Sequence, residues 1–459
     1  MNSQDNILKV KEKYITLYNN NIDVLKNDCP DYINDLREKA IKKFDELGIP
    51  SRKDEEYKYT DLRNVFSGNY KNYFAPTKLE FDIDEVFKCD VPNIDTISVF
   101  LLNGWYYNNQ EDFIYLNDGA VIGSLKAAIK EYPEIIKKHF GKYADINKDG
   151  LVALNTAFAK NGIFLYVPKN VVLEKPIQIV NILMDEEAGM TQHRNLFVFE
   201  ENSQANMVIC DHTLSHQNFV TNSVSEIVVG ENSKLDFERT QNEHNGSNQI
   251  SHLFFNQKRN STVTSNTITL HGGLVRNNIY VDMCEEGCEN NAYGLFLADR
   301  GQHIDNKIFI DHSKPNCTSK QMFKAVLDDY ASGVFNGKVL VREGAQNTQA
   351  SQTNNNILLT DDAKINTKPQ LEIYADDVKC SHGATVGQLD NEALFYLRSR
   401  GISEKEAKLL LMYAFAHDII GKIKVPALKN RIDDLVEKRL RGELSVCNTC
   451  KMNCVTKKD

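Results

Sequence analysis

The sequence of 459 residues has little proline and tryptophan, with 10 Pro and 1 Trp, and it contains no long apolar run. No stretch approaches the roughly 18 apolar residues that a membrane-spanning helix needs. The N-terminus also lacks the basic and then apolar pattern of a secretion signal. We therefore expect a cytoplasmic protein without membrane contact. Positive charge is in deficit, since 54 Lys and Arg stand against 63 Asp and Glu, a net charge of −9, and this argues against broad affinity for nucleic acid.

Familiar catalytic motifs are missing as well. The chain contains neither the G-x-x-x-x-G-K-[ST] phosphate loop nor the G-x-G-x-x-G dinucleotide fingerprint. The G-x-S-x-G and H-E-x-x-H motifs of hydrolases and zincins are likewise absent. We expect that this chain binds no nucleotide, and that any ATP-driven step depends on an ATPase in another chain.

The ten cysteines are expected to be reduced thiols, because no secretion signal is present. Three of them form the compact motif Cys447-x-x-Cys450-x-x-x-Cys454 near the C-terminus. This motif supplies three ligands, whereas closed zinc and iron–sulfur sites usually have four. The three cysteines are therefore a weak candidate for a metal site, and an incidental cluster of exposed thiols is the alternative. Cys284-x-x-x-Cys288 is expected to lie in a turn.

Helical patterns occupy both ends of the chain. Apolar residues at 33, 36, 40, 41, 44 and 47 lie on one face of a predicted helix that ends at Gly48. From about 80 to 150 the pattern is mixed, and Ile97–Leu102 is a predicted buried strand. Three further helices are predicted after residue 388, and they begin at Asp390, Ser403 and Pro426.

The middle of the chain, from about 160 to 380, has the pattern of many short strands. Apolar runs recur between turns rich in Asn, Ser, Gly and Asp. The pairs Asn202-Ser203, Asn232-Ser233 and Asn260-Ser261 repeat at intervals of 30 and 28 residues. A period near 30 residues indicates a stacked β-solenoid, in which each coil buries its inner face against its neighbours. A large β-sandwich is the alternative that this pattern leaves open.

These patterns divide the chain into three regions. We predict a helical and mixed α/β region at 1–155, a β-solenoid core at 156–387, and a C-terminal helical domain with a cysteine-containing tail at 388–459. Residues 421–459 carry ten Lys and Arg against five Asp and Glu. This basic segment is either a docking surface for an acidic partner or a solvated helix face.

Cys380 and His382 are the clearest candidates for chemistry. They lie in the sequence Cys380-Ser381-His382-Gly383, at the end of the β-rich region. In an extended segment, residues i and i+2 point to the same face, about 6.6 Å apart along the strand. A thiolate and an imidazole placed in this way could bind one soft metal ion or activate a thiol. A buried cysteine beside a hydrogen-bonded histidine at a turn is the structural alternative.

Several segments resemble the SufB/SufD family of iron–sulfur cluster assembly proteins. Near the N-terminus, Glu56-Tyr57-Lys58-Tyr59-Thr60-Asp61-Leu62 is similar to the E-W-K-Y-T-[DS]-L element of the SufD branch, with Tyr57 in place of the usual Trp. The stretch Leu154-Asn155-Thr156-Ala157-Phe158 is similar to the one that enters the family's core. Two further segments, 378–387 and 395–402, match the C-terminal signature that both branches share. The motif at Cys447, Cys450 and Cys454 has no counterpart in the family pattern.

The resemblance implies a mainly β fold, a right-handed parallel β-helix flanked by N-terminal and C-terminal helical segments. It also implies a non-catalytic scaffold subunit of a SufBCD-type complex, with a SufB-like homologue as one partner. A SufC-like ATPase would bind the C-terminal helices, and other proteins would deliver sulfur. His382, supported by Cys380, would hold a transient iron–sulfur cluster shared with the homologue.

Two other functions remain open from the residues alone. One is a β-helix carbohydrate-active enzyme, in which acidic residues line an exposed groove. The other is a structural homodimer.

Overall fold

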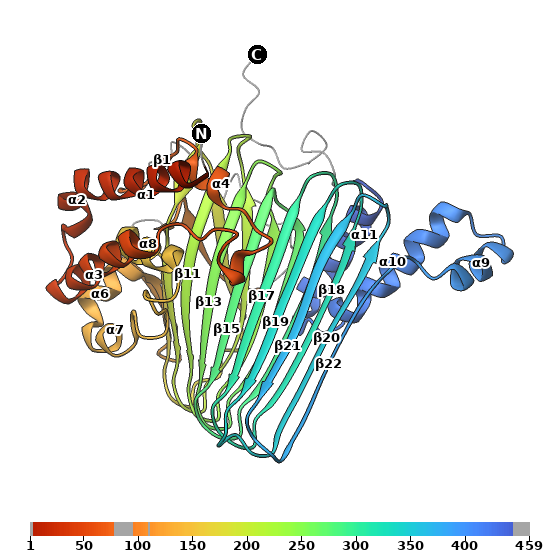
Figure 1. The fold of residues 1–459 in the computed structure, drawn as a ribbon. Helices are drawn as coiled ribbons and strands as arrows, with labels where there is room; N and C mark the ends of the chain where they lie inside the picture. Colours follow the sequence, from red (N-terminus) through yellow and green to blue (C-terminus); the bar gives the residue numbers. More distant parts are fainter. Residues whose placement is uncertain (1–2, 78–94, 109–110, 444–459) are drawn as a thin grey trace.

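The computed structural model describes residues 3–77, 95–108 and 111–443. Its centre is a β-solenoid of about eight turns, with one group of helices beside its first coils and a second group near its last coils (Figure 1). Among the described residues, none of the helices is both long and apolar enough to cross a lipid bilayer.

Two sheets form the solenoid, and the chain passes from one sheet to the other in every coil. The first sheet contains, in spatial order, β21 (Lys364–Ile373), β19 (Ser332–Val341), β17 (His303–His312), β15 (Leu274–Met283), β13 (Asn248–Gln257), β11 (Phe219–Val229), β9 (Arg194–Phe199), β6 (Ile163–Val167), β5 (Val121–Ser124) and β4 (Phe113–Tyr115), with β8 (Gly189–Thr191) and β1 (Lys71–Asn72) paired beside β11.

The second sheet contains, in spatial order, β22 (Val378–Gly387), β20 (Thr348–Leu358), β18 (Thr318–Leu327), β16 (Glu289–Ala298), β14 (Thr262–His271), β12 (Lys234–Asn242), β10 (Gln204–Thr213), β7 (Ile177–Leu183), β2 (Ile97–Leu102) and β3 (Trp105–Tyr107). From β10 to β20, each strand pairs in parallel with the strand two places further along the chain. This connectivity is that of a solenoid, so the β-sandwich alternative is wrong.

An asparagine ladder marks the turns that join the coils. Asn202, Asn232 and Asn260 have φ angles of 57°, 56° and 55°, in the left-handed region that Asn tolerates. The Asn232 Nδ2 atom donates to Asn202 Oδ1 at 3.1 Å, and Asn260 Nδ2 donates to Asn232 Oδ1 at 3.2 Å. The repeat of 28 to 30 residues in the sequence is therefore the length of one coil, and the predicted solenoid is confirmed.

Part of the solenoid interior is polar, and this explains why the strands are longer than the short apolar runs of the sequence predict. Gln241, Ser251 and Asn277 are buried, and Gln241 and Ser251 each hydrogen-bond to Asn277. Asn277 Nδ2 donates to Gln241 Oε1 at 2.9 Å, and Ser251 Oγ donates to Asn277 Oδ1 at 2.9 Å. Because these side chains satisfy each other between coils, a strand can be buried without being apolar.

Glu243, directly after β12, is a buried carboxyl in this polar interior. Burial raises the pKa of Glu243 to about 8, and the neighbouring carboxylate of Asp211 acts in the same direction. Arg239 and Ser247 oppose the shift. An unfolded glutamate has a pKa near 4.3, so at intermediate pH the folded chain holds a proton that the unfolded chain releases. The resulting stabilisation is complete below about pH 4 and is lost as the pH rises through 8.

We expect Glu243→Gln to remove this pH dependence. Between pH 5 and pH 8, the free energy of unfolding of the unmodified chain should fall with pH more steeply than that of the variant, by up to about 1.4 kcal/mol per pH unit. Urea unfolding followed by circular dichroism at pH 5, 6.5 and 8 measures both slopes. Glu187→Gln, at an exposed glutamate, is the control. Equal slopes for the unmodified chain and Glu243→Gln would contradict the expectation.

The N-terminal helices pack beside the first coils. They are α1 (Ser3–Asn20), α2 (Ile22–Lys26), α3 (Asp31–Leu47), the 3₁₀ helix η1 (Glu55–Tyr57), α4 (Arg63–Ser67), α6 (Leu125–Glu131), α7 (Pro133–His139) and α8 (Gly150–Phe158). The helix predicted to end at Gly48 is α3, and the strand predicted at Ile97–Leu102 is β2, so both are confirmed.

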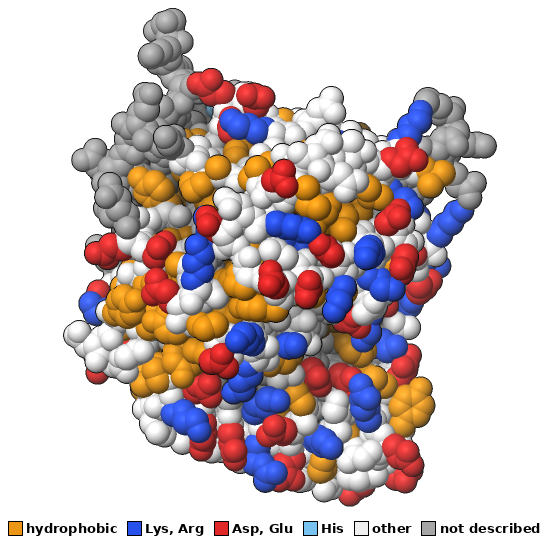
Figure 2. All heavy atoms as spheres, turned by 90° about the vertical axis from the view of Figure 1, so that its left-hand side faces the viewer, with side chains coloured by type: hydrophobic (Ala, Val, Ile, Leu, Met, Phe, Trp, Pro, Cys, Tyr) orange, Lys and Arg blue, Asp and Glu red, His pale blue; other side chains and the backbone are white. Residues whose placement is uncertain are grey.

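Because β2 pairs with β7 and β5 pairs with β6, the region before residue 156 extends both sheets. On the face that these helices cover, acidic, basic and hydrophobic side chains are interspersed (Figure 2).

The two N-terminal segments that carry the family resemblance fix this region to the solenoid. In the first, the Tyr57 hydroxyl donates to Asp149 Oδ2 at 2.6 Å, and the Arg276 guanidinium lies 3.8 Å from the centre of the Tyr57 ring. In the second, Asn155 Nδ2 donates to the carbonyl oxygens of His193 and Asn222 at 2.9 and 2.8 Å. Both segments therefore have structural roles as docking contacts.

The C-terminal helices are α9 (Asn391–Ser399), α10 (Glu404–Ile420) and α11 (Pro426–Leu440). Their predicted starts are confirmed, since Asp390 accepts from the backbone N–H of Glu392 and Ser403 accepts from that of Glu406. The apolar faces of α10 and α11 cover the outer face of the second sheet, in a cluster that includes Leu409, Met412, Ile419, Ile420, Leu428 and Ile432 against Val208, Ile268, Leu270 and Leu295.

Candidate functional site

The last coil of the solenoid has two open strand edges. β21 ends the first sheet and β22 ends the second, with no strand of the described chain beyond either of them. β22 is exposed along most of its length. Its backbone groups on the outer side lack a partner strand within the described residues, and such an edge is a template for pairing with another chain.

Cys380 and His382 both lie on β22, where their register partners in β20 are Ala350 and Gln352. Cys380 packs in a cluster with Val339 of β19, so its side chain points toward the opposite sheet. His382 follows two residues later and therefore points to the same side. The structure thus brings these two residues onto one face at the open end of the solenoid.

The environments of these two side chains differ. Cys380 is half-buried, and burial raises the pKa of its thiol. His382 is exposed, and beneath it Gln352 is buried and donates to Gln321 Oε1 at 2.7 Å. Within the described residues, no three His, Cys, Asp or Glu side chains are grouped closely enough to hold a metal ion. Cys380 and His382 therefore supply at most two ligands by themselves.

The two edge strands are not equally suited to pairing. β21 carries Pro369 together with Lys364 and Lys368, and proline and lysine are the residues that protect a sheet edge. β22 contains no proline and a single lysine, Lys379. The edge beside Cys380 and His382 is therefore the more receptive one.

Helix α9 is a second exposed feature near the last coil. None of its residues is buried, and it extends away from the solenoid (Figure 1). The side chains of Phe395 and Tyr396 are 75% and 57% exposed. Two neighbouring aromatic side chains on an exposed helix are typical of an interaction surface. The sequence predicted the helix but did not show that its aromatic residues are uncovered.

The motif formed by Cys447, Cys450 and Cys454 lies outside the described residues, so its proposed role as a metal site stays a prediction. Cys284 and Cys288 flank a turn, as predicted.

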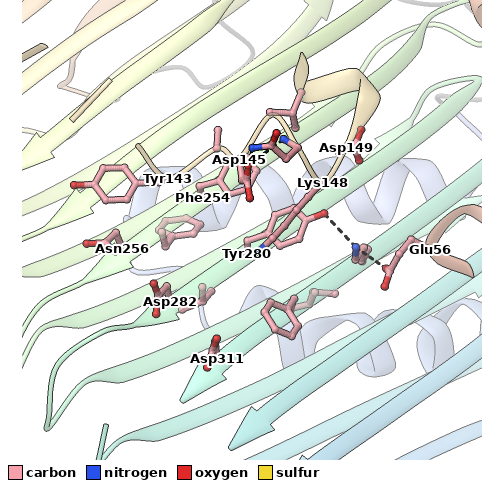
Figure 3. Close-up of a pocket in the computed structure, with 18 of the residues that line it drawn as sticks. Glu56, Tyr143, Asp145, Lys148, Asp149, Phe254, Asn256, Tyr280, Asp282 and Asp311 are labelled. Carbon is pink, nitrogen blue, oxygen red and sulfur yellow. Dashed lines mark hydrogen bonds and ion pairs between the residues drawn. The ribbon is translucent and has the colours of Figure 1, made fainter. Parts of the chain in front are cut away.

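A cleft of about 700 Å³ lies between the loop at 141–149 and the outer face of the first sheet (Figure 3). The rings of Phe254 and Tyr280 stack there with their centres 4.8 Å apart. The adjacent acidic residues Asp282 and Asp311 resemble the lining expected of a carbohydrate-active enzyme. However, Asp311 forms an ion pair with Arg342 at 2.7 Å, so these two residues do not present a pair of free carboxylates.

Comparison with known proteins identifies the relatives of this chain. Residues 182–415 match the family model described as "SUF system FeS cluster assembly, SufBD core domain", and residues 8–179 match "SufBD protein N-terminal region". The chain is 31% identical to an iron–sulfur cluster assembly SufBD family protein of Synechocystis, over 88% of this chain and 90% of that protein. It is 27% identical to the iron–sulfur cluster assembly protein SufD of Escherichia coli, over 86% and 90% of the two chains. The identity to SufD of Bacillus subtilis is 25%, over 95% and 99%.

Proposed function

Since the chain belongs to the SufBD family of iron–sulfur cluster assembly proteins, we propose that it is a non-catalytic scaffold subunit whose last coil pairs with a SufB-like homologue. The observation that carries this proposal is the open edge of β22, which is exposed and lacks proline. A homologous solenoid with a similar open edge would continue the sheet and satisfy the free backbone groups.

The position of Cys380 and His382 supports a role in holding the nascent cluster, which is the cargo of the assembly. Both side chains lie on the edge strand, so a partner paired with β22 would bring its own ligands next to them. Iron–sulfur clusters are usually held by four ligands, and a histidine in place of a cysteine gives a different electronic environment. Two ligands from each chain would hold the cluster only while the chains are paired.

Helix α9 is the proposed contact for a SufC-like ATPase. The sequence contains neither of the nucleotide-binding motifs named above, so an ATPase would have to be another chain, and the exposed aromatic pair on α9 offers a hydrophobic anchor for such a protein. The helices α10 and α11 are already packed on the second sheet, so they serve as the base from which α9 projects.

The pairing of the last coil can be tested by charge substitution at its exposed apolar residues. Ile373 and Val386 are 41% and 47% exposed, on β21 and β22. We expect the double variant Ile373→Asp, Val386→Asp to weaken co-purification with a co-expressed SufB-like homologue, because pairing would bury both carboxylates without partners. Size-exclusion chromatography with light scattering measures the complex.

Tyr330→Asp provides the control, because Tyr330 is 72% exposed in the turn between β18 and β19. This variant should retain the complex. An unchanged heterodimer for the double variant would contradict the proposed edge. A homodimer that excludes the SufB-like chain would instead support the structural-homodimer alternative.

A further inference from the structure

Two buried thiols, Cys288 and Cys317, lie inside the solenoid in adjacent coils. They directly precede β16 and β18, in which Glu289 and Thr318 are register partners. Their exposed fractions are 1% and 0%. The Sγ atoms of Cys288 and Cys317 lie 3.1 and 3.4 Å from the same acceptor, the carbonyl oxygen of Glu285. The two thiols are therefore neighbours, although 29 residues separate them in the sequence (317 − 288 = 29).

These two thiols differ in their acidity. The neighbouring Cys288 thiol and His312 imidazole lower the pKa of Cys317 to about 5. The same contact between the thiols, together with burial, raises the pKa of Cys288. His312 is itself buried, and its Nε2 lies 2.8 Å from Ser319 Oγ. Two neighbouring thiols, one with a lowered pKa and one with a raised pKa, are the arrangement found in reactive dithiols.

Packing alone does not require a thiol at this position of the coil. The three preceding coils have Ser203, Ser233 and Ser261 there, as the register of β10, β12, β14 and β16 shows. Ser203 Oγ donates to Ser233 Oγ at 3.2 Å, and Ser261 Oγ donates to Cys288 Sγ at 3.9 Å. Because a hydroxyl fills the same place in three coils, the two cysteines add chemical reactivity without being needed to fill space.

The turn directly before Cys288 is partly exposed to solvent. Residues 284–287 are only partly buried, and Gly287 has a φ angle of 73°. Cys284 lies in this turn and is a competing thiol. Burial raises the pKa of Cys284 to about 11, so it remains protonated and less reactive at neutral pH.

We propose that Cys288 and Cys317 are a redox-active pair that forms a disulfide between adjacent coils when it reacts with hydrogen peroxide. The Cys317 thiolate attacks one peroxide oxygen, the O–O bond breaks, and hydroxide leaves, so that Cys317 becomes a sulfenic acid. The Cys288 sulfur then attacks Cys317 Sγ, the S–S bond forms and the S–O bond breaks. The proton of Cys288 leaves with the hydroxyl group as water. The two sulfurs lose two electrons, and the peroxide is reduced to hydroxide and water.

The test uses the folded, fully reduced chain and stoichiometric hydrogen peroxide. After the reaction, the chain is unfolded, its free thiols are alkylated, and its peptides are analysed by mass spectrometry. We expect a peptide that links Cys288 to Cys317, reversible by dithiothreitol, and a higher Tm for the oxidised chain. The proposal would be overturned if the linked peptide forms only in urea. It would also be overturned if no linked peptide forms while Cys284 or Cys380 is oxidised.

The rate of oxidation provides a second measurement. Because the pKa of Cys317 is lowered to about 5, the rate should change little between pH 6 and pH 8, whereas the rate of an ordinary thiol rises by about tenfold per pH unit in this range. A rate that follows the ordinary thiol profile would overturn the assignment of Cys317 as the attacking residue.

Serine variants of Cys288 and Cys317 separate the attacking thiol from the thiol that then forms the disulfide. Serine occupies the same position in the earlier coils, so both variants are expected to fold. Cys288→Ser should stop at the sulfenic acid on Cys317, which dimedone traps. Cys317→Ser should yield neither the linked peptide nor a dimedone adduct on Cys288. Cys210→Ser is the matched control, because Cys210 is also buried but lies in β10, and this variant should retain the linked peptide. A dimedone adduct on Cys288 in Cys317→Ser would reverse the assignment.

Discussion

Replacement of His382 with Ala is expected to reduce iron–sulfur cluster assembly by about tenfold or more, the effect typical of losing a residue that supports a metal site. His382 is exposed on β22, so the substitution removes no core packing. The chain should therefore keep its Tm and its partners. A cluster held by two ligands from each chain would lose one of the two that this chain supplies.

The experiment measures cluster formation on the co-purified complex. Visible absorption monitors the bound cluster, and transfer to an apo-ferredoxin acceptor measures its release. His382→Cys tests the chemistry, because a thiolate can replace the imidazole as a ligand and should restore part of the activity. Cys380→Ser should have a smaller effect, since we assign Cys380 the supporting role. Unchanged assembly in the double variant His382→Ala, Cys380→Ser would contradict the proposed site.

The terminal cysteines provide a control for this experiment. We expect replacement of Cys447, Cys450 and Cys454 by serine to leave cluster assembly intact, because the three thiols are interpreted as incidental. Loss of assembly in that variant, with assembly retained in His382→Ala, would indicate that the cluster ligands are the terminal cysteines and not the residues of β22.

Replacement of the exposed aromatic pair on α9 is expected to abolish stable binding of the SufC-like ATPase. Aromatic anchors at the centre of an interface typically contribute about 2 kcal/mol or more each, which corresponds to about 30-fold in Kd. Phe395→Ala and Tyr396→Ala should therefore each weaken the complex by about this factor, and the double variant should bind more weakly than either. The free chain should remain folded, since both side chains are already exposed.

Isothermal titration of the full-length variants with the ATPase measures these effects. Tyr330→Ala is the matched control, because it removes an equally exposed aromatic side chain from another surface. Deletion of 388–459 is a poorer test, because α10 and α11 cover Ile268, Leu270 and Leu295 and their loss would uncover part of the core. Unweakened binding by the double variant would contradict the assignment of α9.

Much of the architecture could be predicted from the sequence because a solenoid repeats its local structure. Asn202, Asn232 and Asn260 recur at the same turn in successive coils, so the coil length is visible as a sequence interval. Helix starts at Asp390 and Ser403 were also predictable, because an N-cap depends on a side chain and the next three residues. Cys380 and His382 share a face for an equally local reason, the alternation of side chains along a strand.

The tertiary structure decided which residues meet across coils and which remain uncovered. Cys288 and Cys317 are neighbours only because β16 and β18 pair in a particular register, and that register depends on the lengths of the intervening turns. The exposure of Phe395 depends on how far α9 extends from the second sheet. The open edge of β22 exists because no later strand follows it in the described chain. The sequence by itself determined the repeating coil, whereas long-range packing determined the thiol pair, the aromatic surface and the open edge of β22, because each of these depends on residues far apart in the chain.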